Sequence, residues 1–162
     1  TCCGQPAMNS GDRSDAKSLA RQVIKAFAQV DYVVAPSGSC AGTIKTHYPE
    51  LFDDEPEMAA AVADLTERTW ELTSFLTTVM KVARVDGRYD GVVTYHDSCS
   101  GLRELGVRPQ PRALLEGIDG LSVKEMEMRD TCCGFGGTFC VKYPEISGKM
   151  VDAKADEVLA IA

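Results

Sequence analysis

Thr131-Cys132-Cys133-Gly134 repeats the sequence Thr1-Cys2-Cys3-Gly4 after an interval of 130 positions. A run of four identical residues that includes adjacent cysteines favours an internal duplication. We therefore predict two related halves, residues 1–88 and 89–162. The repeat places the counterpart of Cys40 near position 170, beyond this chain. The chain also lacks an initiator methionine and stops within a helical pattern, so we expect both ends to be truncated.

Strand-like and helix-like segments alternate along the chain. Apolar residues at alternating steps of four and three, from Met58 to Ala83, predict one long helix over about residues 56–85. Buried strands are predicted at 32–36, 91–95 and 123–128, and further helices at 13–30, 102–105, 112–118 and 143–162. Strands separated by helices imply right-handed crossovers. The predicted fold class is therefore α/β, with a mostly parallel sheet, flanking helices and Rossmann-like crossovers.

Composition and charge exclude several classes of protein. The 162 residues are 44% hydrophobic and 25% charged, which is typical of a soluble globular protein. A net charge of −7 repels a phosphate backbone, so we expect no nucleic-acid partner. No apolar run approaches the length of a membrane span, so any membrane contact is expected through partners. Seven cysteines, an odd number, favour metal or redox chemistry in a reducing compartment, which predicts a cytoplasmic protein.

The cysteines occupy related places in the predicted fold. Cys40, Cys99 and the Cys132-Cys133 pair each follow a predicted strand, and the repeat gives Cys2-Cys3 the same place. The carboxyl ends of parallel strands meet at one edge of a sheet, where ligands gather. Cysteines that are distant in sequence can therefore converge there.

Adjacent cysteines bind one centre only where the backbone turns sharply. Consecutive Cα atoms lie about 3.8 Å apart, which is too close for an unstrained disulfide. Gly4 and Gly134 follow the two pairs and can adopt the positive φ of such a turn. After Gly134 a glycine-rich segment opens a helix, whose free N–H groups can donate to sulfur. This arrangement suits an anionic iron–sulfur centre.

Other interpretations use the same residues. The glycines after Cys133 do not match G-x-G-x-x-G, which disfavours a dinucleotide site. Structural zinc also uses thiolates and stays an alternative. His96 could activate a nucleophilic cysteine, although a non-ligand role is favoured. Cys140 is predicted to be a small buried hydrophobic residue. Arg103, Arg129 and Lys142 could hold a substrate carboxylate, but solvated surface charge is the favoured interpretation.

Cys99 and, thirty-two residues later, Cys132-Cys133-Gly134 resemble the first part of the motif of the cysteine-rich CCG domain family. That motif is a cysteine, a spacer, Cys-Cys-Gly, a second spacer and Cys-x-x-Cys. The family includes a cysteine-rich component of heterodisulfide reductase, iron–sulfur components of glycolate and glycerol-3-phosphate dehydrogenases, and lactate-utilization proteins. Residues 36–40, 131–139 and 141–147 are most similar to the lactate-utilization members, and the resemblance covers essentially the whole chain.

The resemblance implies an iron–sulfur electron-transport subunit of an oxidoreductase, which works with other subunits to oxidise L-lactate to pyruvate. It implies a [4Fe–4S] cluster, in some relatives non-cubane, with zinc as an alternative in the first site. Position by position, it implies that Cys99, Cys132 and Cys133, with Gly134 in the same turn, form the second site and that Cys2, Cys3 and Cys40 form the first.

This sequence departs from the family pattern. In the first site, Ser37 stands where Cys-x-x-Cys would begin, and the leading cysteine before Cys2 is missing from this chain. The second site lacks the final Cys-x-x-Cys after Gly134, so each site has at most three cysteines. Two alternative functions therefore stay open. They are a zinc-stabilised interaction module and a cluster-free thiol–disulfide protein.

Overall fold

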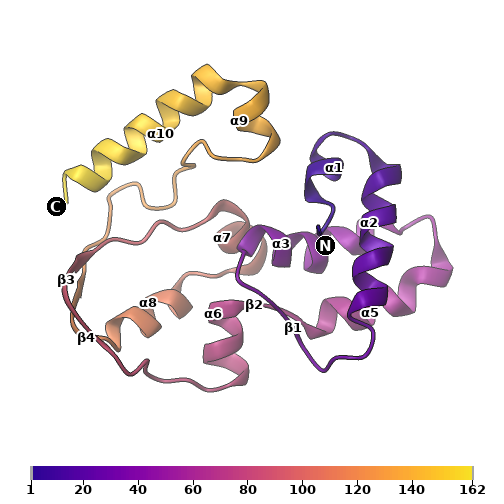
Figure 1. Ribbon diagram of the computed structural model, residues 1–162, viewed down its shortest axis with the longest axis horizontal. Helices are drawn as coiled ribbons and strands as arrows, with labels where there is room; N and C mark the ends of the chain where they lie inside the picture. Colours follow the sequence, from indigo (N-terminus) through magenta and orange to yellow (C-terminus); the bar gives the residue numbers. More distant parts are fainter. Residues whose placement is uncertain (1, 162) are drawn as a thin grey trace. The chain divides into compact units, whose positions relative to one another are not determined.

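The computed structural model describes residues 2–161, so Thr1 of the repeated motif and Ala162 lie outside the described residues. Internal contacts divide the chain after Leu72 into two compact units, residues 2–72 and 73–161. Each unit contains one parallel pair of strands with flanking helices (Figure 1). The predicted α/β class is confirmed. The assignment of residues 1–88 and 89–162 to two copies of a repeat stays a prediction.

The first unit consists of short helices around a two-stranded sheet. Its elements are α1 (Gln5–Asn9), α2 (Arg13–Ala26), β1 (Val33–Ala35), α3 (Gly38–Gly42), the π-helical turn η1 (Thr43–His47), α4 (Tyr48–Leu51), the 3-10 turn η2 (Pro56–Met58), α5 (Ala59–Arg68) and β2 (Thr69–Glu71). The side chain of Asp12 accepts a hydrogen bond from the Asp15 N–H and thereby caps α2. The predicted helix at 13–30 is present and ends at Ala26.

The core of the first unit packs α2, η1, α4 and α5 around Cys3. Its buried residues are Cys3, Ala16, Ala20, Val23, Val33, Ile44, Tyr48, Leu51, Phe52, Val62 and Leu65. Ala16 and Ala20 of α2 are both fully buried in this core. A predicted ligand, Cys3, is therefore part of the core.

The prediction of a single long helix over residues 56–85 is wrong. The helix α5 ends at Arg68, and β2 then pairs in parallel with β1 in the register Val33↔Thr69. The Lys45 amine donates to the carbonyl oxygens of Thr66 and Thr69 at 2.8 and 2.9 Å. These bonds satisfy carbonyl groups freed at the helix end. The apolar stripe continues through the break because Leu65 on the helix and Thr69 on the strand are both buried.

The second unit contains the other parallel pair. After α6 (Leu72–Ser74), which begins in the first unit, its elements are the π-helical turn η3 (Phe75–Val79), β3 (Arg88–Val93), α7 (Cys99–Leu105), α8 (Pro109–Glu116), β4 (Asp119–Val123), α9 (Thr138–Lys142) and α10 (Pro144–Leu159). Strands β3 and β4 pair through Gly91↔Leu121 and Val93↔Val123. The predicted helices at 102–105 and 112–118 correspond to α7 and α8.

The strand predicted at 123–128 lies earlier in the chain, at Asp119–Val123. Its partner β3 ends at Val93, and the Lys124 N–H makes the last bond to that strand, to the Val93 carbonyl at 2.8 Å. Residues 124–131 continue as a loop with Met126 buried. The longest helix in residues 2–161, α10, has 16 residues, and none there is long and apolar enough to cross a bilayer.

Candidate functional site

Cys2, Cys3 and Cys40 form what we call the first thiol cluster. Cys3 precedes α1, and Cys40 lies in α3, directly after β1. The Sγ atoms of Cys3 and Cys40 are 3.6 Å apart. Metal–sulfur bonds of about 2.3 Å at tetrahedral angles place two sulfurs about 3.8 Å apart. The Cys3 and Cys40 thiols are therefore spaced like two ligands of one metal.

A tight turn at Gly4 positions this pair. Gly4 has φ +87°, and its N–H donates to the Cys2 Sγ at 3.4 Å. The fully buried Tyr48 hydroxyl donates to the carbonyl oxygen of Cys3 at 2.9 Å. The glycine thus supplies the left-handed backbone and the tyrosine fixes the peptide next to it.

Burial governs the protonation of Cys3 in the first thiol cluster. Burial is the main cause that raises the pKa of Cys3 to about 11. A backbone hydrogen bond at Gln5 lowers this pKa, whereas the hydrogen bond and the charge of Cys40 raise it. Burial also raises the pKa of Tyr48 above its usual value. Without a cation, Cys3 is therefore protonated at neutral pH. Metal binding would displace that proton.

Cys99, Cys132 and Cys133 form the second thiol cluster. Cys99 begins α7, and the other two lie in the loop before α9. The pKa of Cys99 is raised by burial first, and then by the charge and hydrogen bond of Cys132 and by the charge of Cys133, whereas Arg103 lowers it. The effects of Cys132 and Cys133 on this pKa place Cys99 near both of them, although they are far apart in sequence.

The second cluster has a turn like the first. Gly134 has φ +83°, and its N–H donates to the Cys132 Sγ at 3.5 Å. The buried Ser147 hydroxyl of α10 donates to the Gly134 carbonyl at 2.9 Å. The expected sharp turn after each Cys-Cys pair is present in both units.

The thiols are the right type of donor for a thiolate-bound metal, but each cluster has fewer than the four ligands that such a metal usually takes. Sulfur donors with N–H groups directed at them suit zinc or an iron–sulfur cluster. Each cluster contains three cysteines, and Ser37 bonds to Ser39, with 2.9 Å between the two hydroxyl oxygens. Within residues 2–161 no three His, Cys, Asp or Glu side chains are already close enough together to hold a metal ion. Side chains of each cluster would therefore have to move to complete a site.

Other residues singled out in the sequence have structural partners. The His96 Nδ1 lies 2.8 Å from the carbonyl oxygen of Arg129, consistent with its expected non-ligand role. The Arg129 Nε lies 3.6 Å from a Glu125 carboxylate oxygen. The prediction that Cys140 is buried is wrong, because this residue is only partly buried. None of the described residues of α9, which contains Cys140, is buried.

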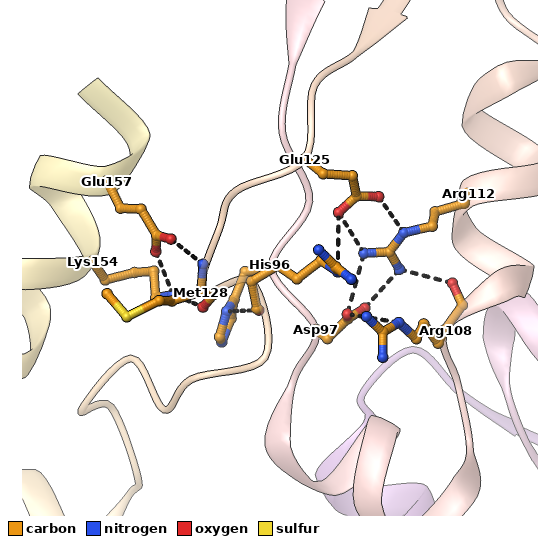
Figure 2. Close-up of polar contacts among 9 residues, drawn as sticks. His96, Asp97, Arg108, Arg112, Glu125, Met128, Lys154 and Glu157 are labelled. Atoms are coloured by element: carbon orange, nitrogen blue, oxygen red, sulfur yellow. Dashed lines mark hydrogen bonds and ion pairs between the residues drawn. The ribbon is translucent and has the colours of Figure 1, made fainter. Parts of the chain in front are cut away.

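Sequence reasoning missed Asp97. This carboxylate is buried two residues before Cys99 and binds Arg112 of α8 (Figure 2). The sequence signal that could have identified Asp97 is a carboxylate between a predicted strand and a cysteine. Sequence reasoning also missed Tyr48 and Ser147, since a hydroxyl that binds a distant carbonyl leaves no periodic pattern.

Known proteins resemble this chain over nearly its whole length. Residues 1–45 and 93–161 match the CCG cysteine-rich domain family. The chain is 46% identical to "Lactate utilization protein A" of Oceanobacillus iheyensis, covering 98% of this chain and 64% of that protein. Proteins of the same name from Geobacillus kaustophilus and Lysinibacillus sphaericus are 48% and 46% identical, and the matches cover 98% and 97% of this chain and 66% and 68% of theirs.

The chain therefore spans about two-thirds of the length of these relatives. No solved structure matches it.

Proposed function

This chain belongs to the cysteine-rich CCG domain family, and on that premise we propose that it is an iron–sulfur redox subunit of a lactate-utilisation system. The convergence of distant thiols carries the proposal. The Sγ atoms of Cys3 and Cys40 are 3.6 Å apart, and Cys132 raises the pKa of Cys99; each pair lies beside a glycine turn of the same geometry. The sulfur donors of two such clusters are the ligands that iron–sulfur centres use.

The second thiol cluster is the stronger candidate for a [4Fe–4S] centre, in cubane or non-cubane form. Cys99, Cys132 and Cys133 would hold it, and the Gly134 N–H would offset negative charge on sulfur. When bound, the cluster supplies one-electron transfer. A cluster of this kind is ordinarily held by four thiolates, so another donor would complete the site.

The first thiol cluster would hold either a second iron–sulfur centre or zinc. Cys2, Cys3 and Cys40 would bind the metal, and Ser37 replaces the sulfur that the family motif has at that position. The chain's own residues bind the metal and orient its ligands. Tyr48 fixes the Cys3 carbonyl, and the buried Cys3 gives up its proton as a cation binds.

The lactate part of the proposal comes from the name of the relatives. Their name refers to lactate utilization, and we infer that this chain passes electrons from L-lactate oxidation to another carrier. Other subunits of the complex would be its partners. A cytoplasmic site would keep the thiols reduced.

Metal analysis of the chain tests this function. Protein purified without oxygen and reconstituted with ferrous iron and sulfide should contain both in similar amounts and absorb broadly in the visible range. Cys99→Ser should lose the iron of the second cluster. Cys140→Ser is the matched control and should keep it, because the Cys140 thiol donates to the Gly137 carbonyl and stands outside both clusters.

Two outcomes would replace this proposal. Colourless protein with stoichiometric zinc would indicate a zinc-stabilised interaction module. Protein that binds neither metal but exchanges disulfides, with the activity lost in Cys132→Ser, would indicate a thiol–disulfide protein.

A further inference from the structure

Asp97 is a fully buried carboxylate in the loop that joins β3 to Cys99. Its side chain is 0% exposed, and a charge in such a place is costly unless it is paired. Arg112 of α8 pairs it with two bonds, Nη1 to Oδ1 at 2.7 Å and Nη2 to Oδ2 at 3.2 Å. The Arg108 Nε lies 3.6 Å from Oδ2. Figure 2 shows both guanidinium groups around this carboxylate.

The backbone next to Asp97 is bonded to the loop that carries the other two thiols. The Asp97 N–H donates to the carbonyl oxygen of Arg129 at 3.0 Å, and the His96 Nδ1 reaches the same oxygen at 2.8 Å. Arg129 lies three residues before Cys132. One carbonyl therefore joins the two cysteine-bearing loops.

Arg112 makes a second link between the same loops. Besides Asp97 it binds Glu125, with Nη2 2.9 Å from Oε2 and a further bond from Nε to Oε1. Figure 2 shows its guanidinium between the two carboxylates. The planar fork of arginine suits this double pairing, which a lysine cannot reproduce. The Asp97 carboxylate thus fixes an arginine that also holds the loop before Cys132.

The other side of that loop is held by α10. Lys154 donates to the Met128 carbonyl, and Glu157 accepts from the Met128 N–H. Lys154 and Glu157 also pair with each other at 2.8 Å. The loop before Cys132 is therefore bonded to α10 on one side and to Asp97 and Arg112 on the other.

We propose that Asp97 is a positioning residue that holds Cys99 against Cys132 and Cys133. The identity of the metal rests on the proposed function, whereas the placement of the three thiols by Asp97 does not depend on which metal binds. A buried ion pair is by itself weak support for stability, because apolar replacements are often as stable. The bonds from Asp97 instead join the two loops whose cysteines must meet.

Arsenite tests the positioning independently of iron. Trivalent arsenic forms three bonds to three thiols and releases water, with no change of oxidation state, so it binds tightly only where three thiols converge. A Cys40→Ser background leaves the second cluster as the one with three thiols. In the folded protein, Asp97→Asn should bind arsenite about 10- to 100-fold more weakly, the usual cost of removing a residue that orients metal ligands.

The matched control is Asp119→Asn. Asp119 pairs with Arg84 at 2.6 Å in the same unit, but its side chain is 64% exposed and it bonds to neither cysteine loop. This variant should keep the affinity of the background protein. A purely structural role for Asp97 would lower the urea midpoint and leave the arsenite affinity of the folded chain unchanged, and that result would overturn the proposal.

Arg112→Lys provides a second test in case Asp97→Asn does not fold. Arg112→Lys keeps the positive charge and loses the fork, so it should also weaken arsenite binding, and unchanged affinity would count against positioning. Arsenite affinity that does not depend on Cys99 would overturn the inference as well. Iron uptake with no effect of Asp97→Asn on arsenite leaves the proposed function standing and removes the positioning role. The reverse pattern, weaker arsenite binding in a chain that takes up no iron, supports positioning and removes the iron–sulfur function.

Discussion

A Cβ atom on Gly134 would lie 2.6 Å from the carbonyl oxygen of Ser147, which is closer than side chains approach backbone. The equivalent atom on Gly4 would lie 3.2 Å from the carbonyl oxygen of Ala16. In both units a helix thus packs directly on the glycine of the Cys-Cys-Gly turn, and the glycine N–H donates to the first thiol. Lack of a side chain is therefore required for helix packing at Gly134 and leaves little room for one at Gly4, besides allowing the left-handed backbone at both.

Replacing Gly134 by alanine should destabilise the second unit. The left-handed conformation, φ +83°, costs an alanine about 1 to 2 kcal/mol. Overlap with Ser147 and with the Met150 Cβ, 2.7 Å away, adds about 1 to 3 kcal/mol. Urea unfolding of Gly134→Ala measures the loss. Gly148→Ala is the control, because this glycine lies within α10 with no atom near the added Cβ, and it should gain about 0.5 to 1 kcal/mol. Equal effects of the two substitutions would contradict the packing described.

Loss of the Tyr48 hydroxyl should destabilise the first unit. Tyr48→Phe keeps the buried ring and leaves the Cys3 carbonyl without its 2.9 Å partner. An unpaired buried acceptor costs about 1 to 3 kcal/mol, which urea unfolding can measure. Tyr89→Phe removes a hydroxyl from a residue that is 58% exposed and should change stability by less than about 0.5 kcal/mol.

The Glu125–Arg112 pair should make stability depend on pH. Hydrogen bonds from Arg112 hold the pKa of Glu125 below its usual 4.5. The unfolded chain therefore binds the proton more readily, so the pair stabilises the fold above about pH 4.5 and loses this effect as pH falls through the lower folded pKa. Compared with Glu125→Gln, the natural chain should be more stable at pH 7 by at most about 1 kcal/mol, because Glu125 is partly exposed. The difference should shrink as the pH falls below about 4.5 and vanish below the folded pKa, and a difference that grows in acid would contradict the pairing.

The places of the cysteines after strands and beside turns were predictable because they depend on strand order and on short repeated motifs. A predicted strand with Cys40 or Cys99 shortly after it indicates the carboxyl end of a sheet, and Gly134 after two cysteines indicates a turn. Both signals are local in sequence, and the structure shows the cysteines after β1 and β3 and the turns at Gly4 and Gly134. The prediction of one shared sheet edge is wrong, because β1 and β3 belong to separate two-stranded sheets.

The break at β2 was not predictable from periodicity. Thr69 is buried in the same stripe as Leu65, so the pattern reads as one helix, and the break depends on Lys45, more than twenty positions away. Asp97 was missed for a related reason. Its role depends on Arg112 and the Arg129 carbonyl, which the fold brings together and no spacing rule identifies.

The 3.6 Å separation of Cys3 and Cys40 predicts which disulfide forms when the metal-free chain is oxidised. Diamide takes two electrons and two protons from a pair of thiols and becomes the hydrazine, while one S–S bond forms. Cys2 and Cys3 are adjacent, and their geometry disfavours a bond between them. Mass spectrometry of native protein treated with diamide should therefore find Cys3 linked to Cys40 before other pairs.

The same reaction should accelerate with pH. Burial raises the pKa of Cys3 to about 11, so the thiolate that attacks becomes more abundant throughout the range from neutral pH to that value. Cys3→Ser should abolish the fast linkage, and Cys140→Ser should leave it intact because that thiol stands outside both clusters. A dominant bond between Cys40 and any cysteine of the second cluster would show that the thiols are not grouped as the two units place them.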